Sequence, residues 1–168
     1  NRTFGLSMAK RKKASGVWVV CILATVFASQ AAADRSADIK DVCTDLVLDY
    51  AYYRDRPEPE QLGRLFTKDA TLMVMGQAFK GRSEIEKRVR DARDGPVFRH
   101  MMSTIRIFVL DADHARGVSY VTVYSAPPGE GPRPLQDPVA VGEYHDQFVR
   151  TEHGWQIAQR EFVAVYLP

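Results

Sequence analysis

The sequence predicts an α+β domain in which three N-terminal helices pack on a strongly curved, mainly antiparallel sheet. Apolar residues recur at steps of three and four through residues 36–55, which is the period of a helix. After Val97 the chain shows four long runs rich in β-branched and aromatic residues, separated by turn signals. Helices followed by a series of strands are typical of α+β domains with the helices gathered on one side of the sheet.

Residues 1–33 predict a cleaved secretory signal peptide. Residues 10–13 are all basic, residues 16–28 are largely apolar, and Ala31-Ala32-Ala33 fits the small-residue cleavage pattern before Asp34. The apolar stretch is shorter than the roughly 20 residues of a comfortable membrane span. We therefore expect no stable membrane span after cleavage, with an uncleaved N-terminal anchor as the alternative.

This signal peptide defines the expected domain and its location. Residues 1–7 precede a plausible start at Met8 and form a possible upstream extension. Residues 34–168 are the expected mature domain, long enough for one hydrophobic core. We expect the protein to be secreted or periplasmic.

The composition of the mature domain argues against a nucleic-acid partner and against an intrachain disulfide. It keeps 18 of the 23 basic residues and all 21 acidic residues, a formal net charge of −3, so we expect no nucleic-acid partner. Cys43 is the one cysteine that remains after cleavage, so no intrachain disulfide can form. Its place among apolar residues predicts a small, buried, hydrophobic side chain.

The first two helices are predicted from periodicity and from a break at Pro57. Residues 36–55 form the first helix, and a proline disfavours helical geometry in the residue before it. Residues 58–66 restart a helix with two acids in the first turn, where the helix dipole favours them. A β-rich run follows from residue 66 to 71. The apolar row of the first helix comprises Ile39, Val42, Cys43, Leu46, Tyr50 and Tyr53.

A short strand pair and a third helix come next. Residues 72–75 and 77–79 predict a hairpin or a bulged pair of strands. Ser83 is expected to cap the third helix, because Glu86 stands three residues later at the spacing of a capping box. That helix is expected to continue to about Asp94.

The rest of the chain predicts strands over residues 97–108, 118–125, 139–151 and 155–167. The proline- and glycine-rich segment 127–134 cannot hold a strand ladder and is expected to be an exposed loop. Long strands twist and coil, so one side of the sheet can become concave. The first helix would cover that side incompletely, which predicts a pocket between helix and sheet.

Several motifs together resemble a SnoaL-like domain of the nuclear-transport-factor-2-like superfamily, which includes scytalone dehydratase and steroid isomerases. They are residues 50–55, residues 65–70, Gly81, His100, Tyr144 and residues 154–157. The resemblance covers residues 36–165 and implies a cone-shaped sheet with a central pocket. Because this scaffold carries many activities, the resemblance alone implies no single reaction.

The resemblance implies candidate catalytic residues. Asp55 matches the pocket aspartate of scytalone dehydratase, and His100 matches its partner histidine. In that enzyme the pair holds a water or acts directly as acid and base in the elimination of water. The second pocket histidine of that enzyme falls at Ser119 here, and the tyrosine beside its aspartate falls at Arg54. These departures predict a different substrate.

The resemblance and the residue types also give candidate ligand-binding residues. Tyr50 matches the tyrosine that donates to the developing oxyanion in steroid isomerases, and Glu143 falls close to their second, protonated acid. Glu143 and His145 share one strand face while Tyr144 and Asp146 share the other, so one pair alone can face inward. The candidates are Tyr50, Tyr53, Tyr120, Glu143 and Tyr144.

No metal or other cofactor is predicted. The four histidines, His100, His114, His145 and His153, are isolated and show no spacing typical of metal ligands. A carboxylate beside an imidazole can instead move protons without a cofactor. The reaction class that these residues favour is dehydration, isomerisation or epoxide opening, catalysed by a lyase or an isomerase.

Two main hypotheses follow. The first is an acid–base enzyme that acts on a small apolar or aromatic ligand. The second is a non-catalytic ligand-binding or dimerising scaffold of the same fold, and an accessory subunit is a weaker third. We expect a homodimer in either case, because an outer sheet face that carries apolar side chains needs a cover.

Overall fold

The computed structural model describes residues 17–168, with side chains described from residue 32 onward. The chain divides into two compact units, and Ser36–Pro168 forms the unit with the sheet and its helices. The basic residues 10–13 and the possible extension lie outside the described residues, so the signal peptide stays a prediction. In the part of the chain that is described, no helix is long and apolar enough to cross a membrane.

The described residues form three helices: α1 (Val17–Asp55), α2 (Pro59–Arg64) and α3 (Arg82–Arg90). The predicted apolar row of α1 is largely buried, but Val42 is 43% exposed. Val47, four residues before Ala51, is fully buried instead. The buried face of this helix therefore includes Val47 and Ala51 in addition to the predicted row, and it leaves Val42 out.

The prediction for the start of α3 was wrong. The cap residue is Gly81, with φ of 81°, and no side chain caps the helix. The Glu84 carboxylate instead accepts a hydrogen bond of 2.7 Å from the backbone N–H of Lys80. The helix also ends at Arg90, earlier than predicted, and turns follow it up to Gly95.

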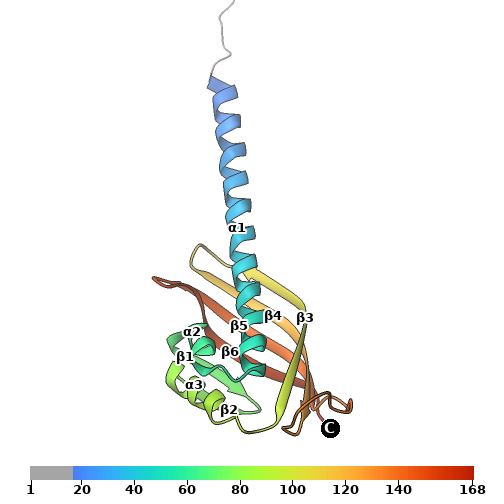
Figure 1. Ribbon diagram of the computed structural model, residues 1–168. Coiled ribbons are helices and arrows are strands. Elements are labelled where there is room, and N and C mark those ends of the chain that lie inside the picture. Colours follow the sequence, from blue (N-terminus) through green and yellow to red (C-terminus); the bar gives the residue numbers. More distant parts are fainter. Residues whose placement is uncertain (1–16) are drawn as a thin grey trace, which may run out of the picture. The chain divides into compact units, whose positions relative to one another are not determined.

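Six strands form one mixed, mostly antiparallel sheet in the order β2-β1-β6-β5-β4-β3 (Figure 1). Their bounds are β1 Phe66–Val74, β2 Gln77–Lys80, β3 Val97–Val109, β4 His114–Ala126, β5 Ala140–Thr151 and β6 Gly154–Tyr166. The four predicted long strands are confirmed as neighbours in an antiparallel series. The short predicted pair, β1 and β2, joins the same sheet through a parallel pairing of β1 with β6. The proline-rich segment is an exposed loop between β4 and β5, as predicted.

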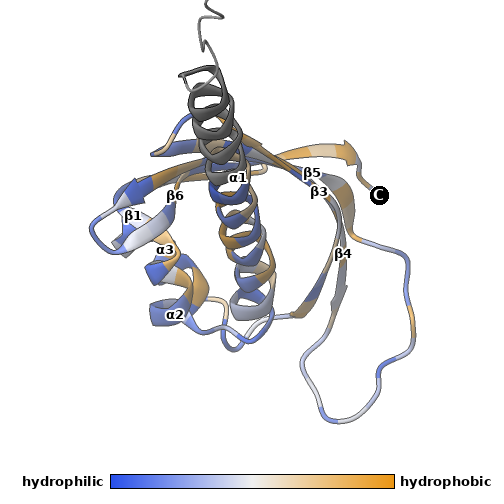
Figure 2. Cartoon of the chain, turned by 90° about the horizontal axis from the view of Figure 1, so that it is seen from above, coloured by the Kyte–Doolittle hydropathy of each residue, from blue (hydrophilic) through white to orange (hydrophobic). Residues whose placement is uncertain are grey.

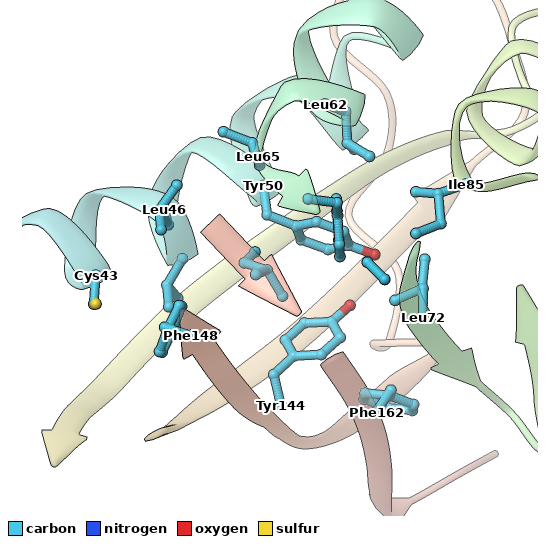
Figure 3. Close-up of a cluster of buried hydrophobic side chains, with 14 of the residues drawn as sticks. Cys43, Leu46, Tyr50, Leu62, Leu65, Leu72, Ile85, Tyr144, Phe148 and Phe162 are labelled. Carbon is cyan, nitrogen blue, oxygen red and sulfur yellow. The ribbon is translucent and has the colours of Figure 1, made fainter. Parts of the chain in front are cut away.

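From Ser36 onward, α1 lies over one face of the sheet, with α2 and α3 beside it (Figure 2). Apolar residues of all these elements form a single buried cluster. Figure 3 shows how Cys43, Leu46 and Tyr50 of α1 approach Tyr144 and Phe148 of β5. The α+β class and the position of the core therefore agree with the sequence.

Cys43 is fully buried in this cluster. Burial, and secondly the negative charge of Asp146, raise the pKa of its thiol to about 12. The side chain therefore stays an uncharged thiol at physiological pH and cannot act as a thiolate nucleophile. This confirms its interpretation as a buried hydrophobic residue.

Candidate functional site

Asp55 and His100 are held together at two points. Nδ1 of the His100 ring lies 2.5 Å from Oδ1 of Asp55, and the backbone N–H of His100 donates to Oδ2 at 2.9 Å. The two side chains are only 7% and 8% exposed. The predicted contact between these residues is thus present, and it leaves Nε2 as the ring nitrogen that can meet a ligand.

The local structure explains why these two residues meet. Asp55 is the last residue of α1, because Pro57 disfavours helical geometry at Arg56. A turn follows, in which the backbone N–H of Glu58 donates a hydrogen bond of 3.0 Å to the carbonyl oxygen of Tyr53. His100 lies on β3, which is an edge strand of the sheet. Backbone N–H groups on the free side of an edge strand need a partner, and the Asp55 carboxylate supplies one.

A cavity of about 220 Å³ lies next to the His100 ring. Its walls are mostly apolar, and its polar groups are two arginines, two tyrosines and one histidine. The cavity is smaller than the roughly 300–1,000 Å³ typical of sites for drug-sized ligands, so it suits a small molecule. Its lining residues are Tyr50, Arg54, Val74, Met75, Arg88, Phe98, His100, Val123, Val139, Ala140, Tyr144 and Phe162.

Tyr50 and Tyr144 form a pair of phenols in the cavity wall. Their rings meet edge to face with centroids 5.4 Å apart, and their hydroxyl groups converge (Figure 3). Burial, and then the hydrogen-bonded phenol of Tyr50, raise the pKa of Tyr144 well above its ordinary value. Tyr144 therefore stays neutral at physiological pH, and both of these candidate ligand-binding residues line the cavity.

A buried ion pair supports these phenols. The Arg160 guanidinium donates to both carboxylate oxygens of Asp146, at 2.6 and 2.7 Å, and both side chains are fully buried. The same guanidinium lies 4.3 Å from the ring centre of Tyr50 and 4.7 Å from that of Tyr144. Sequence reasoning missed this pair, although the shared face of Tyr144 and Asp146 was a signal that an acid points into the core.

Two predicted ligand-binding residues do not reach the cavity. Tyr120 is 47% exposed on the outer face of the sheet, where its strand partner is Glu143. The Glu143 carboxylate lies 2.8 Å from Nε2 of the exposed His145, and with Tyr120 it borders a separate hollow. Successive side chains of a strand point to opposite faces of the sheet, and on β5 the inward-facing ones are Tyr144 and Asp146. The structure therefore places Tyr120 and Glu143 outside the central cavity.

Tyr53 and Ser119 also lie outside the cavity lining. Tyr53 is half-buried and packs edge to face with Tyr52, with centroids 5.4 Å apart. Ser119, at the position of the second histidine of scytalone dehydratase, is fully buried, and its hydroxyl has no hydrogen-bond partner among the described residues. The described residues also contain no cluster of three or more potential metal ligands. His100 is thus the one imidazole that the described chain places in this cavity.

The helices and the mixed sheet define a nuclear-transport-factor-2-like fold. The chain belongs to the SnoaL-like domain family, whose model matches residues 23–161. A comparison with curated proteins found no match.

Three solved structures illustrate the range of similar proteins. A Mycobacterium tuberculosis protein of unknown function is 21% identical, with a TM-score of 0.71 over 80% of this chain and 76% of that one. A proposed scytalone dehydratase from Novosphingobium aromaticivorans is 23% identical, with a TM-score of 0.69 over 80% and 89%. A hexachlorocyclohexane dehydrochlorinase, LinA type 2, is 15% identical, with a TM-score of 0.62 over 77% and 90%. At these identities the similarity establishes the fold.

Proposed function

We propose that this protein binds a small, largely apolar molecule in the central cavity and moves a proton on it with His100, supported by Asp55. The observation that carries this proposal is the position of the His100 ring, which borders the cavity while Asp55 holds its Nδ1. In this proposal the sheet coils into a cone around the cavity. Similar structures described as a dehydratase and a dehydrochlorinase support an elimination or isomerisation reaction.

The proposed reaction begins at Nε2 of His100, which accepts a proton from carbon. The electron pair of the broken C–H bond forms a new double bond, and either a leaving group departs from the next carbon or the charge moves to a conjugated oxygen. The Asp55 carboxylate stabilises the imidazolium that forms. The phenol of Tyr144 is hydrogen-bonded to that of Tyr50, and the Tyr50 hydroxyl donates a hydrogen bond to oxygen as negative charge develops there. No cofactor takes part in these steps.

The main alternative is a ligand-binding protein without catalysis. Ser119 favours it, because a serine stands where scytalone dehydratase has its second histidine, and here its side chain lies outside the cavity lining.

In either case we propose a secreted or periplasmic location, which N-terminal sequencing of the exported protein would decide. A homodimer through the outer sheet face also stays a prediction, which sedimentation velocity of the chain would decide.

Deuterium exchange tests the catalytic proposal. The full chain would be incubated in D₂O with small cyclic ketones such as 2-indanone and 2-tetralone, and exchange at the carbon next to the carbonyl would be followed by NMR. We expect accelerated exchange, and we expect His100→Ala to reduce it by roughly 10²–10⁴-fold, the usual contribution of a positioned base. His145→Ala is the matched control, since His145 is an exposed histidine on the outer face.

The thermal unfolding temperature of each variant separates chemistry from stability. Loss of exchange in a His100→Ala variant that still folds supports the dyad. Binding of the ketones without accelerated exchange in the unmodified chain would support the non-catalytic alternative.

A further inference from the structure

Two arginines in the cavity wall lack a carboxylate partner. Arg54 is only 6% exposed, and Arg88 has a buried Nη1 atom for which the described residues offer no hydrogen-bond partner. Neither takes part in an ion pair within the described residues; the Asp55 carboxylate, next to Arg54 in sequence, contacts His100 instead. Among the described residues, the cavity wall therefore contains two guanidinium groups that form no ion pair with a carboxylate.

Aromatic rings hold these guanidinium groups in place. The Arg54 guanidinium lies 4.9 Å from the ring centre of Phe98, and that of Arg88 lies 5.1 Å from the ring centre of Phe79. Stacking on a ring stabilises a guanidinium without a hydrogen bond acceptor. The N–H groups of both arginines can then serve an additional partner.

The two cations also repel each other. Burial is the largest cause of the lowered pKa of Arg54, and the positive charge of Arg88 lowers it too, while Tyr50, Tyr144 and Asp55 act in the opposite direction without outweighing them. Arg160, a third buried guanidinium, differs in its charge balance: Asp146 contacts it through two hydrogen bonds, although its own Nη1 also has no partner among the described residues. An anion bound to Arg54 and Arg88 would remove their repulsion and satisfy the free Nη1 group.

We propose that Arg54 and Arg88 form an anion-binding subsite and that the ligand is a small cyclic or aromatic carboxylate. The apolar lining of the cavity, which includes Val74, Met75 and Phe162, would contact the ring of such a molecule. The carboxylate would accept hydrogen bonds from the two guanidinium groups. This proposal rests on the central cavity being the ligand site, as in the proposed function, but it does not require catalysis.

Matched pairs of ligands test the proposal on the unmodified chain. Binding of benzoate, cyclohexanecarboxylate and 2-naphthoate would be compared at pH 8 with binding of the corresponding neutral amides, by calorimetry or by NMR. We expect at least one acid to bind roughly tenfold to hundredfold more tightly than its amide, as charge-assisted hydrogen bonds would give. Failure of every acid to bind more tightly than its amide would overturn the proposal without any variant.

Variants then locate the subsite. Arg88→Met should abolish the preference for the acid, and Arg88→Lys, which keeps the charge, should retain part of it. Arg90→Met is the matched control, because Arg90 lies on the same helix but pairs with Glu60 on the surface. Circular dichroism would show that each variant folds, and an equal preference in Arg88→Met and Arg90→Met would place the anion elsewhere and overturn the assignment.

Two further measurements separate this proposal from its alternatives. Inorganic phosphate would be titrated alone, and tight phosphate binding without any preference for organic acids would indicate a site for an inorganic anion and overturn the proposal. His100→Ala should keep the preference for acid over amide while it loses deuterium exchange. Failure of catalysis and failure of the anion subsite are therefore distinguishable.

Discussion

Arg160 shows that the cavity depends on a residue that does not border it. Its buried guanidinium contacts the rings of Tyr50 and Tyr144, and its charge is balanced by Asp146. Burial lowers the pKa of Arg160, but the Asp146 carboxylate and the two phenols outweigh this effect and leave the pKa above its ordinary value. The arginine therefore stays charged, and its carboxylate partner is essential.

Asp146→Asn should destabilise the fold. The substitution removes the negative charge and leaves the cation of Arg160 buried, which costs roughly 3–5 kcal/mol for one partner of a buried pair. Urea unfolding of the variant would measure the change in free energy. Asp91→Asn is the control, because Asp91 pairs with Lys87 on the surface, where a pair contributes about 0–1 kcal/mol. Equal losses in the two variants would show that the buried pair has no special importance.

The sequence could predict the partners of some site residues but not of others. Asp55 and His100 were predictable because a helix-breaking Arg56-Pro57 fixes the end of α1 and because both match a known motif. The pairing of Asp146 with Arg160 depends on the register between β5 and β6, which places them opposite each other across 14 residues of sequence. Alternation along one strand shows which face a side chain takes, but it does not identify the partner on the next strand.

Among the elements, β5 and β6 approach each other closely at Gly142, beside the cavity residue Phe162. A Cβ atom at Gly142 would lie 2.3 Å from the carbonyl oxygen of Val163 and 2.8 Å from the ring of Phe162, which lines the cavity. The pairing register also shifts between Val141 and Gly142. The glycine therefore permits an approach of two strands that any side chain would prevent.

Gly142→Ala should separate β5 from β6 locally. We expect a loss of roughly 1–3 kcal/mol, the usual range for overpacking in a well-packed region. Ligand binding should weaken as well, since Phe162 would have to move. Gly129→Ala is the matched control, because a Cβ there meets no atom within 4 Å. Urea unfolding would compare the two, and a Gly142→Ala variant as stable as the control would contradict the close approach.

The arrangement of elements was only partly predictable for a related reason. Hydrophobic patterns identified the four long strands and α1, since each pattern is a property of one segment. The parallel pairing of β1 with β6 joins segments at opposite ends of the domain, and no local pattern specifies it. The same limit applies to the start of α3, where Gly81 and the Glu84 carboxylate take the place of a serine cap.

At the scale of the whole molecule, the core contains weak acids that the fold keeps uncharged. Cys43 has a pKa of about 12, chiefly because burial disfavours the thiolate. Burial likewise places the pKa of Tyr144 well above its ordinary value of 10.0. Both groups come from the cluster that joins α1 to the sheet, so their ionisation affects the stability of the entire domain.

The stability of the domain should therefore fall at alkaline pH. Because the pKa of Cys43 is raised in the folded state, the unfolded chain loses this proton at lower pH than the folded chain does. The stability that Cys43 contributes is therefore fully present below pH 9 and is lost as pH rises toward 12. Tyr144 adds to this decrease above about pH 10. The measurement is the urea unfolding free energy between pH 8 and pH 10.5, in a Cys21→Ser background so that Cys43 is the one cysteine. Cys43→Ala should make the decrease between pH 9 and pH 10 less steep, and an unchanged slope would show that the buried thiol does not couple folding to pH.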